Sequence, residues 1–356
     1  MRSSAILDSL RKYGSSAVID EIDASALFAS GMEPSEMWMN IAPALRRADV
    51  VVVVLTSGIN RSFFGYMCNE GIAAKSIGII IGGTLADSIA SKRTRYLPML
   101  SFHTLLVQTD SLRRRLKEIG LTNVRVLHNF RTFDTNLLPN IRPRERLSRC
   151  VVYSRLVAEK GIETAVAAVR LFNKRREKPI SLDLYGPVDT KRPEFYDWCM
   201  NLPKNEPIRY RGILDYHTAF LKLNEYDCLL FPTYFDGECF AGTIFEGFAA
   251  GLPIIATDWL YNSEFIQDGK NGFLVPIRRP DIIADKLELL ADRDDLLNQM
   301  SVQSLASFET YREERVAPIL YNAIEEILNA PASKRNFSSA NHFMAARRMR
   351  RRNRFK

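Results

Sequence analysis

The chain has 356 residues, about the length of two ordinary domains. Hydrophobic residues make up 46% and charged residues 25% of it, which is typical of a soluble globular protein with substantial cores. Its longest apolar runs, VVVVL and IGIII, have the length of strands and fall well short of the ~20 residues that cross a bilayer. The N-terminus lacks the apolar core and small-residue cleavage site of a signal peptide, so we expect neither a membrane span nor a signal peptide.

The positive charge is concentrated at one end. Residues 331–356 contain nine Lys and Arg and no Asp or Glu, so the net charge of +8 becomes −1 for residues 1–330. A basic body that would bind nucleic acid is thereby excluded, and the basicity belongs to a tail.

Cysteines and histidines show no spacing that binds a metal. The five cysteines are scattered, odd in number and without a C-x-x-C pair, which argues against a disulfide framework and a zinc site and suits a reducing cytoplasm. The four histidines form no ligand pattern either.

In chain order, the first half predicts four strands, at 48–57, 76–83, 104–109 and 124–129. Each is a continuous apolar run that ends in small or polar residues, as expected of strands covered on both faces. Between the last two, residues 111–120 predict a helix with Thr109 or Asp110 as its N-cap and Gly120 at its end.

After the polar segment 138–149 the alternation restarts. Strands are predicted at 150–154, 181–186, 208–213, 226–233 and 253–258, a helix at 161–175, a tight turn at Asn271-Gly272 and a last helical segment at 307–330. Strand–helix alternation on both sides of a linker predicts an α/β protein with two doubly wound parallel sheets and a ligand site at the carboxyl ends of strands.

The segment FDGECFAGTIFEGFAAG, residues 235–251, places two carboxylates among small and apolar residues. Glu238 falls in the loop after a strand and Glu246 one turn into the next helix, whose N–H groups at Gly242-Thr243 could hold an anion. Donors for phosphate beside carboxylates for hydroxyls suit a nucleotide sugar. In the alternative interpretation, Thr243-x-x-Glu246 is a capping box and Glu238 is a solvated loop residue.

The same segment resembles retaining glycosyltransferases of family 4 (group 1), which have the GT-B fold. Their E-x7-E motif is matched by Glu238 and Glu246, followed in family order by AAGLPIIATDW and DGKNGFLVP. SRLVAEKG at 154–161, LYGPVD at 184–189 and YRGIL at 210–214 also match, whereas Cys239 and Ala241 depart from the common G-E-G-F-P-G-T.

The resemblance implies a role for each matched residue. Glu246 would hold the ribose hydroxyls of the donor, Glu238 the hydroxyls of the transferred sugar, and Arg155 and Lys160 the diphosphate. We therefore take Glu238, Arg155 and Lys160 as the catalytic set. The predicted donor-binding set is Glu246, Phe240, Ala241, Gly242, Thr243, Gly186, Pro187 and Arg211.

It also implies a division of the chain. Residues 1–145 would be the acceptor-binding domain, 146–312 the nucleotide-sugar domain, 313–330 a helix packing back on the first domain, and 331–356 the basic tail. The first domain begins late for this fold: 5–23 resembles its first helix and second strand. Gly82 and Gly83 are predicted on the acceptor side. No catalytic base is assigned, because a histidine such as His128 at a strand end is usually only hydrogen-bonded, and Asp87 has no stronger claim.

The predicted enzyme is a hexosyltransferase that acts without a metal, because no D-x-D pair follows a strand and the acidic run at 292–295 is expected on the surface. Its partners would be a nucleotide-sugar donor and a saccharide or lipid-linked acceptor in bacterial capsule or exopolysaccharide synthesis. Binding through tail residues 343–356 to the anionic inner face of the plasma membrane is predicted for an otherwise cytoplasmic protein. No nucleic acid is expected.

Three alternatives stay open at this point. The chain could be a regulatory or catalytically impaired sugar-nucleotide-binding protein. The hypothesis of a dinucleotide-dependent oxidoreductase is weakened because no G-x-G-x-x-G motif follows an early strand. RNA binding would depend on the tail alone.

Overall fold

The structure is a computed structural model. It describes residues 2–14, 19–22, 33–55, 61–83, 89, 97–132, 137 and 142–331. The chain forms two compact units, each treated by itself below. Unit 1 runs from Asn129 to Arg315, and unit 2 combines Arg2–His128 with the chain from Val316 onward.

Unit 2 contains a parallel sheet of four strands in the order β1-β2-β3-β4. The predicted apolar runs form these strands: β1 (Val51–Leu55), β2 (Ser76–Ile80), β3 (Thr104–Val107) and β4 (Val124–Val126). The helices are α1 (Arg2–Tyr13), α3 (Pro34–Arg47), α4 (Arg61–Asn69), α7 (Asp110–Glu118) and α15 (Pro318–Leu328), with the short 3-10 turns η1 (Ile72–Lys75) and η2 (Leu97–Ser101).

Of the two predicted N-caps, Thr109 and Asp110, Thr109 caps α7. Its side-chain oxygen accepts a hydrogen bond from the N–H of Leu112 at 3.2 Å. At the other end of the chain, α15 lies against this unit. Glu326 on α15 pairs with Arg125 of β4 at 2.7 Å and with His103 at 2.9 Å.

Unit 1 contains a six-stranded parallel sheet in the order β10-β9-β8-β5-β6-β7. The strands are β5 (Arg149–Tyr153), β6 (Ser181–Tyr185), β7 (Ile208–Tyr210), β8 (Cys228–Phe231), β9 (Ile254–Thr257) and β10 (Gly272–Val275). The helices are α8 (Ile162–Arg175), α9 (Pro193–Met200), α10 (Ala219–Leu223), α11 (Gly242–Ala249), α12 (Pro280–Asp292), α13 (Asp294–Tyr311) and α14 (Glu313–Val316), with 3-10 turns η4 (Ala158–Lys160) and η5 (Asn262–Glu264).

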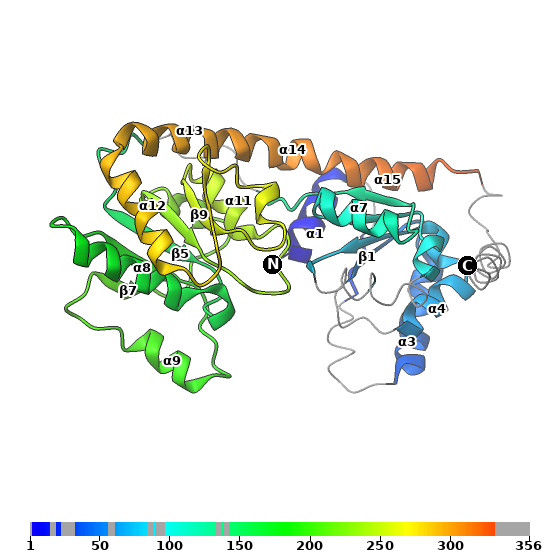
Figure 1. The fold of residues 1–356 in the computed structure, drawn as a ribbon. Coiled ribbons are helices and arrows are strands. Elements are labelled where there is room, and N and C mark those ends of the chain that lie inside the picture. The colour runs from blue at the N-terminus through cyan, green and yellow to red at the C-terminus, as the bar shows by residue number, and fades with distance from the viewer. Residues whose placement is uncertain are drawn as a thin grey trace, which may run out of the picture. The chain divides into compact units, whose positions relative to one another are not determined.

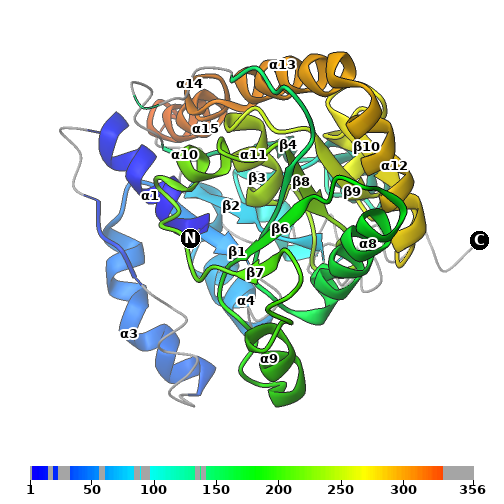
Figure 2. The ribbon, with the colours of Figure 1, turned by 90° about the vertical axis from the view of Figure 1, so that its left-hand side faces the viewer.

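Helices cover both faces of this sheet. Cys150 and Val152 of β5 belong to one buried cluster with apolar residues of α8 and α12, two helices that lie side by side in Figure 1. Side chains alternate between faces along a strand, so Leu229 of β8 points the other way, where α11 packs close enough that Gly247 approaches it. Figure 2 shows α8 and α11 on different sides of these strands.

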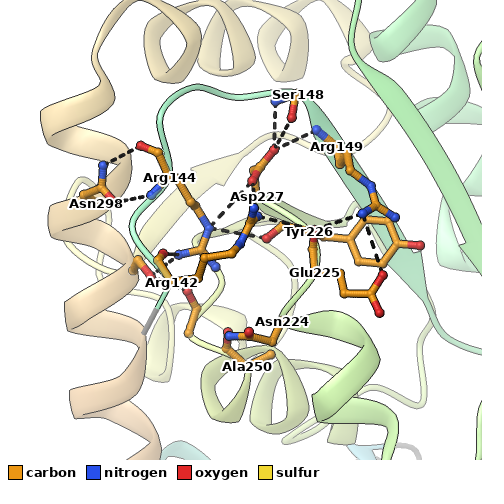
Figure 3. A network of polar contacts seen from close by, with 12 residues as sticks. Arg142, Arg144, Ser148, Arg149, Asn224, Glu225, Tyr226, Asp227, Ala250 and Asn298 are labelled. Atoms are coloured by element: carbon orange, nitrogen blue, oxygen red, sulfur yellow. Dashed lines mark hydrogen bonds and ion pairs between the residues drawn. The ribbon is translucent and has the colours of Figure 1, made fainter. Parts of the chain in front are cut away.

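At the amino ends of β5 and β8, one buried carboxylate joins several parts of unit 1 (Figure 3). Asp227, 2% exposed, accepts hydrogen bonds from the N–H of Ser148 at 2.9 Å and of Arg149 at 2.8 Å. Arg142 pairs with its other oxygen at 2.8 Å, and the buried Arg144 lies 4.0 Å from that oxygen. This network fixes the segment before β5 and leaves the carboxyl ends of the strands available for a site.

One predicted element was wrong in its extent. The last helical segment is not continuous over 307–330: α13 ends at Tyr311, where Arg312 is extended, and α15 begins with Pro318 as its first residue. The extended Arg312 separates α13 from α14, and Pro318, which lacks an N–H, is placed where α15 begins.

All five cysteines are buried, and none of them forms a disulfide. The predicted strand within 5–23 falls largely on residues outside the described part, as do Asp87 and tail residues 332–356. Among the described residues, no helix is both long and apolar enough to cross a membrane.

Candidate active site at the carboxyl ends of β5 and β8

The strand order of unit 1 reverses at β5, which has β6 on one side and β8 on the other. The loops after β5 and β8 therefore run in opposite directions and open a crevice at the carboxyl edge, the usual ligand site of such sheets. Arg155 and Lys160 follow β5, and Glu238 follows β8. The topology thus gathers the predicted catalytic set at one edge.

Lys160 and Glu238 form a buried ion pair between Nζ and Oε2. The two side chains are 9% and 2% exposed, and the Oγ1 of Thr233 donates a second hydrogen bond to the same carboxylate oxygen at 3.0 Å. Because a buried charge is costly without a partner, this pairing explains why both charges are tolerated. The alternative of a solvated Glu238 is therefore wrong.

The ring of Phe235 lies near both cations that follow β5, Arg155 and Lys160. The guanidinium carbon of Arg155 lies 5.4 Å and the Nζ of Lys160 5.2 Å from the centre of its ring. Arg155 is exposed whereas Lys160 is buried, so of these two cations Arg155 is the one open to solvent. Rings hold cations at this distance by the negative charge of their faces.

The helix α11 starts at Gly242 with Ala241 as its N-cap, as predicted from the small residues there. Its first N–H groups have no acceptor within the helix. Thr243 does not cap this helix: its Oγ1 donates to the carbonyl oxygen of Tyr153 at 2.7 Å and so ties α11 to the end of β5. The capping-box interpretation of Thr243 and Glu246 is therefore wrong.

Glu246 pairs with a residue that the sequence did not single out. The Nε of Arg131 lies 3.1 Å from its Oε1, and the two side chains are 5% and 3% exposed. Burial raises the pKa of the nearby Tyr153 above its usual range, and the negative charge of Glu246 raises it further. Two residues before Arg131, the Nδ2 of Asn129 donates to the carbonyl oxygen of Phe240 at 3.1 Å.

The backbone of Gly186 and Pro187 contacts the loop that carries Arg155. Gly186 has φ of 136°, and a Cβ on it would overlap the carbonyl oxygen of Ser154. The carbonyl oxygen of Pro187 accepts from the N–H of Leu156 at 2.8 Å. These contacts support the loop through its backbone.

Arg211 uses its Nε to donate to Asp183 at 3.0 Å, while half of its side chain stays exposed. This ion pair leaves part of the guanidinium accessible at the edge of the sheet.

In unit 2, Gly82 and Gly83 follow β2 and are buried, with Gly82 at φ of 91°. His128 is hydrogen-bonded through Nδ1 to the carbonyl oxygen of Gln108 at 2.9 Å, as its sequence position suggested. Within the described ranges, no three His, Cys, Asp or Glu side chains come together as they would around a metal ion.

Unit 1 thus has two buried carboxylates, each paired with a cation, near the carboxyl edge of an α/β sheet. Comparison with known families bears on what this arrangement is similar to. Residues 148–293 match the family model described as "Glycosyl transferases group 1". The match covers all the donor-site residues predicted in unit 1 and less than half of the chain.

Among curated proteins, the chain is 26% identical over 189 residues to the UDP-N-acetylglucosamine–peptide N-acetylglucosaminyltransferase GtfA subunit of Streptococcus gordonii. That alignment covers 53% of this chain and 34% of the relative. The chain therefore spans about a third of the length of this relative.

Solved structures agree on the fold. The pneumococcal O-GlcNAc transferase GtfA, in complex with UDP and GlcNAc, matches with a TM-score of 0.63 at 18% identity, over 83% of this chain and 60% of that one. Anabaena Alr3699/HepE, in complex with UDP, matches with a TM-score of 0.65 at 13% identity, over 83% and 84%. The predicted fold class is confirmed: the protein has the parallel-sheet α/β architecture of GT-B glycosyltransferases.

Proposed function

We propose that the protein is a retaining glycosyltransferase that moves a hexose-type sugar from a nucleotide donor to a saccharide or lipid-linked acceptor. The observation that carries this proposal is the meeting of two buried carboxylates with separate cations at the switch point: Lys160 with Glu238 and Arg131 with Glu246. The match to the glycosyltransferase family model over this region supports it.

In this proposal the cations serve the leaving group. As the bond between the anomeric carbon and the diphosphate oxygen breaks, its electron pair passes to the diphosphate, which gains negative charge. Arg155, Lys160 and the start of α11 would stabilise that charge without having to reorganise. Glu238 would accept hydrogen bonds from hydroxyls of the sugar, and Glu246 from those of the ribose. The oxygen of the acceptor hydroxyl would bond to the anomeric carbon on the face that the leaving group vacates, and its proton would pass to an oxygen of the departing diphosphate, so no protein base is assigned.

UDP sugars are the first donors to test, and UDP-N-acetylglucosamine the first among them, because the curated relative is named for that donor. The acceptor class is proposed from the family resemblance alone. A place in bacterial surface-polysaccharide synthesis is likewise a proposal, and a peptide acceptor would replace it if transfer to peptide were observed.

The test has two stages. Thermal shifts with a panel of nucleoside diphosphates identify the base, and donor hydrolysis or transfer with the matching sugar nucleotides tests the activity. Glu246→Ala should weaken nucleotide binding, whereas Glu238→Ala should lower transfer more than nucleotide affinity. Unchanged transfer in the double variant would refute the site. Nucleotide binding without hydrolysis or transfer would instead favour the sugar-nucleotide-binding protein.

Two finer proposals go with this function. Transfer should persist after treatment with EDTA if the fixed cations take the place of a metal. Tail residues 343–356, which lie outside the described part, should bind vesicles containing anionic lipid, and their deletion should abolish that binding without changing transfer to a soluble acceptor.

A further inference from the structure

A chain of three buried hydrogen bonds joins residues 129–131 to the start of α11. The Nδ2 of Asn129 donates to the carbonyl oxygen of Phe240 at 3.1 Å. The Nη1 of Arg131 donates to the Oδ1 of Asn129 at 3.1 Å, and its Nε donates to the Oε1 of Glu246 at 3.1 Å. Two residues from a distant part of the sequence thereby hold both the loop before α11 and the carboxylate on its first turns.

Gly242 leaves room for this arrangement. A Cβ at position 242 would overlap the Nη2 of Arg131, so the guanidinium lies directly against the backbone of the first residue of α11. Arg131 and Glu246 are almost fully buried, so neither can rotate freely into solvent. The carboxylate of Glu246 is consequently fixed in one orientation.

The stability of α11 does not explain why the guanidinium of Arg131 lies at its N-terminus. A cation beside the N-terminus of a helix opposes the helix dipole, and here the carboxylate of Glu246 compensates for that charge. Buried ion pairs seldom add stability over apolar residues of similar size. A costly arrangement at the crevice points to a role in ligand binding rather than in folding.

We propose that Arg131, supported by Asn129, is a positioning residue that orients Glu246 toward the ribose of the donor and so makes the site specific for ribonucleotides. This inference rests on the proposed function, in which Glu246 binds the ribose hydroxyls. A carboxylate held at one oxygen by Arg131 meets the hydroxyls at a set angle. Without Arg131 the carboxylate would turn, and the preference for ribose would fall.

The experiment compares the dissociation constants of UDP and 2′,3′-dideoxyuridine 5′-diphosphate by calorimetry. Hydrogen bonds to a charged group predict that the wild-type protein binds UDP roughly 10–100-fold more tightly. In Arg131→Met, which keeps the volume and removes the charge, the ratio should fall to about threefold or less. Arg131→Lys should restore only part of it, because lysine has no second nitrogen to bond Asn129. Arg279→Met, at an exposed arginine paired with Asp281, is the control and should keep the wild-type ratio.

A second variant tests the same inference in case Arg131→Met does not fold. Gly242→Ala displaces the guanidinium without changing Arg131 and should lower the same ratio. The ratio is the readout because loss of stability alone would weaken both ligands alike.

The outcomes separate the two proposals. A wild-type protein that binds neither compound, nor any other nucleoside diphosphate, overturns the proposed function. If the wild-type protein binds UDP but shows no preference for ribose, or if Arg131→Met and Gly242→Ala keep that preference, the inference about Arg131 is overturned and nucleotide binding stands.

Discussion

The Nζ of Lys160 and the Oε2 of Glu238 form an ion pair that is almost completely withdrawn from solvent. They come from the loops after neighbouring strands β5 and β8, 78 residues apart in the sequence. Removing one partner of a buried pair leaves the other charge uncompensated. Substitution of either residue should therefore affect both the stability of unit 1 and the proposed transfer reaction.

Lys160→Met should therefore destabilise the protein by about 3 kcal/mol, and the double variant Lys160→Met/Glu238→Gln should recover most of that loss while transfer stays absent. Urea unfolding measures the free energy. Lys222→Met, which breaks the exposed Lys222–Glu225 pair, is the control and should cost less than about 1 kcal/mol. A double variant as unstable as the single one would contradict the explanation.

Phe235 should matter for binding although it carries no charge. Phe235→Leu removes the ring that Arg155 and Lys160 share, and two such contacts at about 0.5–1 kcal/mol each predict a loss of affinity for UDP of roughly tenfold. Tyr234→Leu is the matched control, because it removes a similar contact with Arg278 and should change the affinity less than about twofold. Equal losses in the two variants would argue against a role for the shared ring.

Gly186→Ala should disrupt the loop that carries Arg155. The added Cβ overlaps the backbone of Ser154, and φ of 136° is unfavourable for alanine, so the expected loss of stability is about 3 kcal/mol or more. Gly212→Ala has φ of 88° but open space around it and should cost only about 1–2 kcal/mol. Thermal unfolding and UDP binding distinguish them; similar losses would mean that crowding against Ser154 is unimportant.

Asp227 should be the costliest carboxylate to remove at the amino edge of the sheet. Burial lowers the pKa of Arg144 to about 10, and the negative charge of Asp227 opposes that shift. Asp227→Ala should destabilise unit 1 by about 3–5 kcal/mol, since it strips the buried Arg144 of its counter-charge. Asp285→Ala, which breaks an exposed pair with Arg175, should cost about 0.5 kcal/mol. Comparable losses in urea unfolding would refute the network's role.

The attachment of α15 to unit 2 should depend on pH. The hydrogen bond from Arg125, and after it that from His103, lowers the pKa of Glu326 to about 2 from an ordinary 4.5. A depressed pKa stabilises the fold above pH 4.5, and the contribution disappears as pH falls toward 2. Because Glu326 is 42% exposed, we expect Glu326→Gln to cost only about 1 kcal/mol at pH 7. Urea unfolding at pH 7 and pH 3 should show the difference shrinking; a constant difference would contradict it.

The sequence alone predicted nine of the ten strands in the described part of the chain, but only some of its helices, such as α7, α8 and α11, because these signals are local. A continuous apolar run such as VVVVL determines a buried strand, and Thr109 determines the start of α7 within a few residues. The motif of Glu238 and Glu246 was equally visible, since its spacing lies within one loop and one helix.

Tertiary structure alone decided which charges meet. Arg131 lies 115 residues before Glu246, and nothing in the run HNFR distinguishes it from a solvated arginine. Likewise Asp227 gains its importance from Ser148 and Arg149, which reach it only because β5 and β8 are neighbours in the sheet. Sequence patterns report the burial of an element, whereas the partner of a buried charge depends on the order of strands, which folding sets through contacts between distant residues.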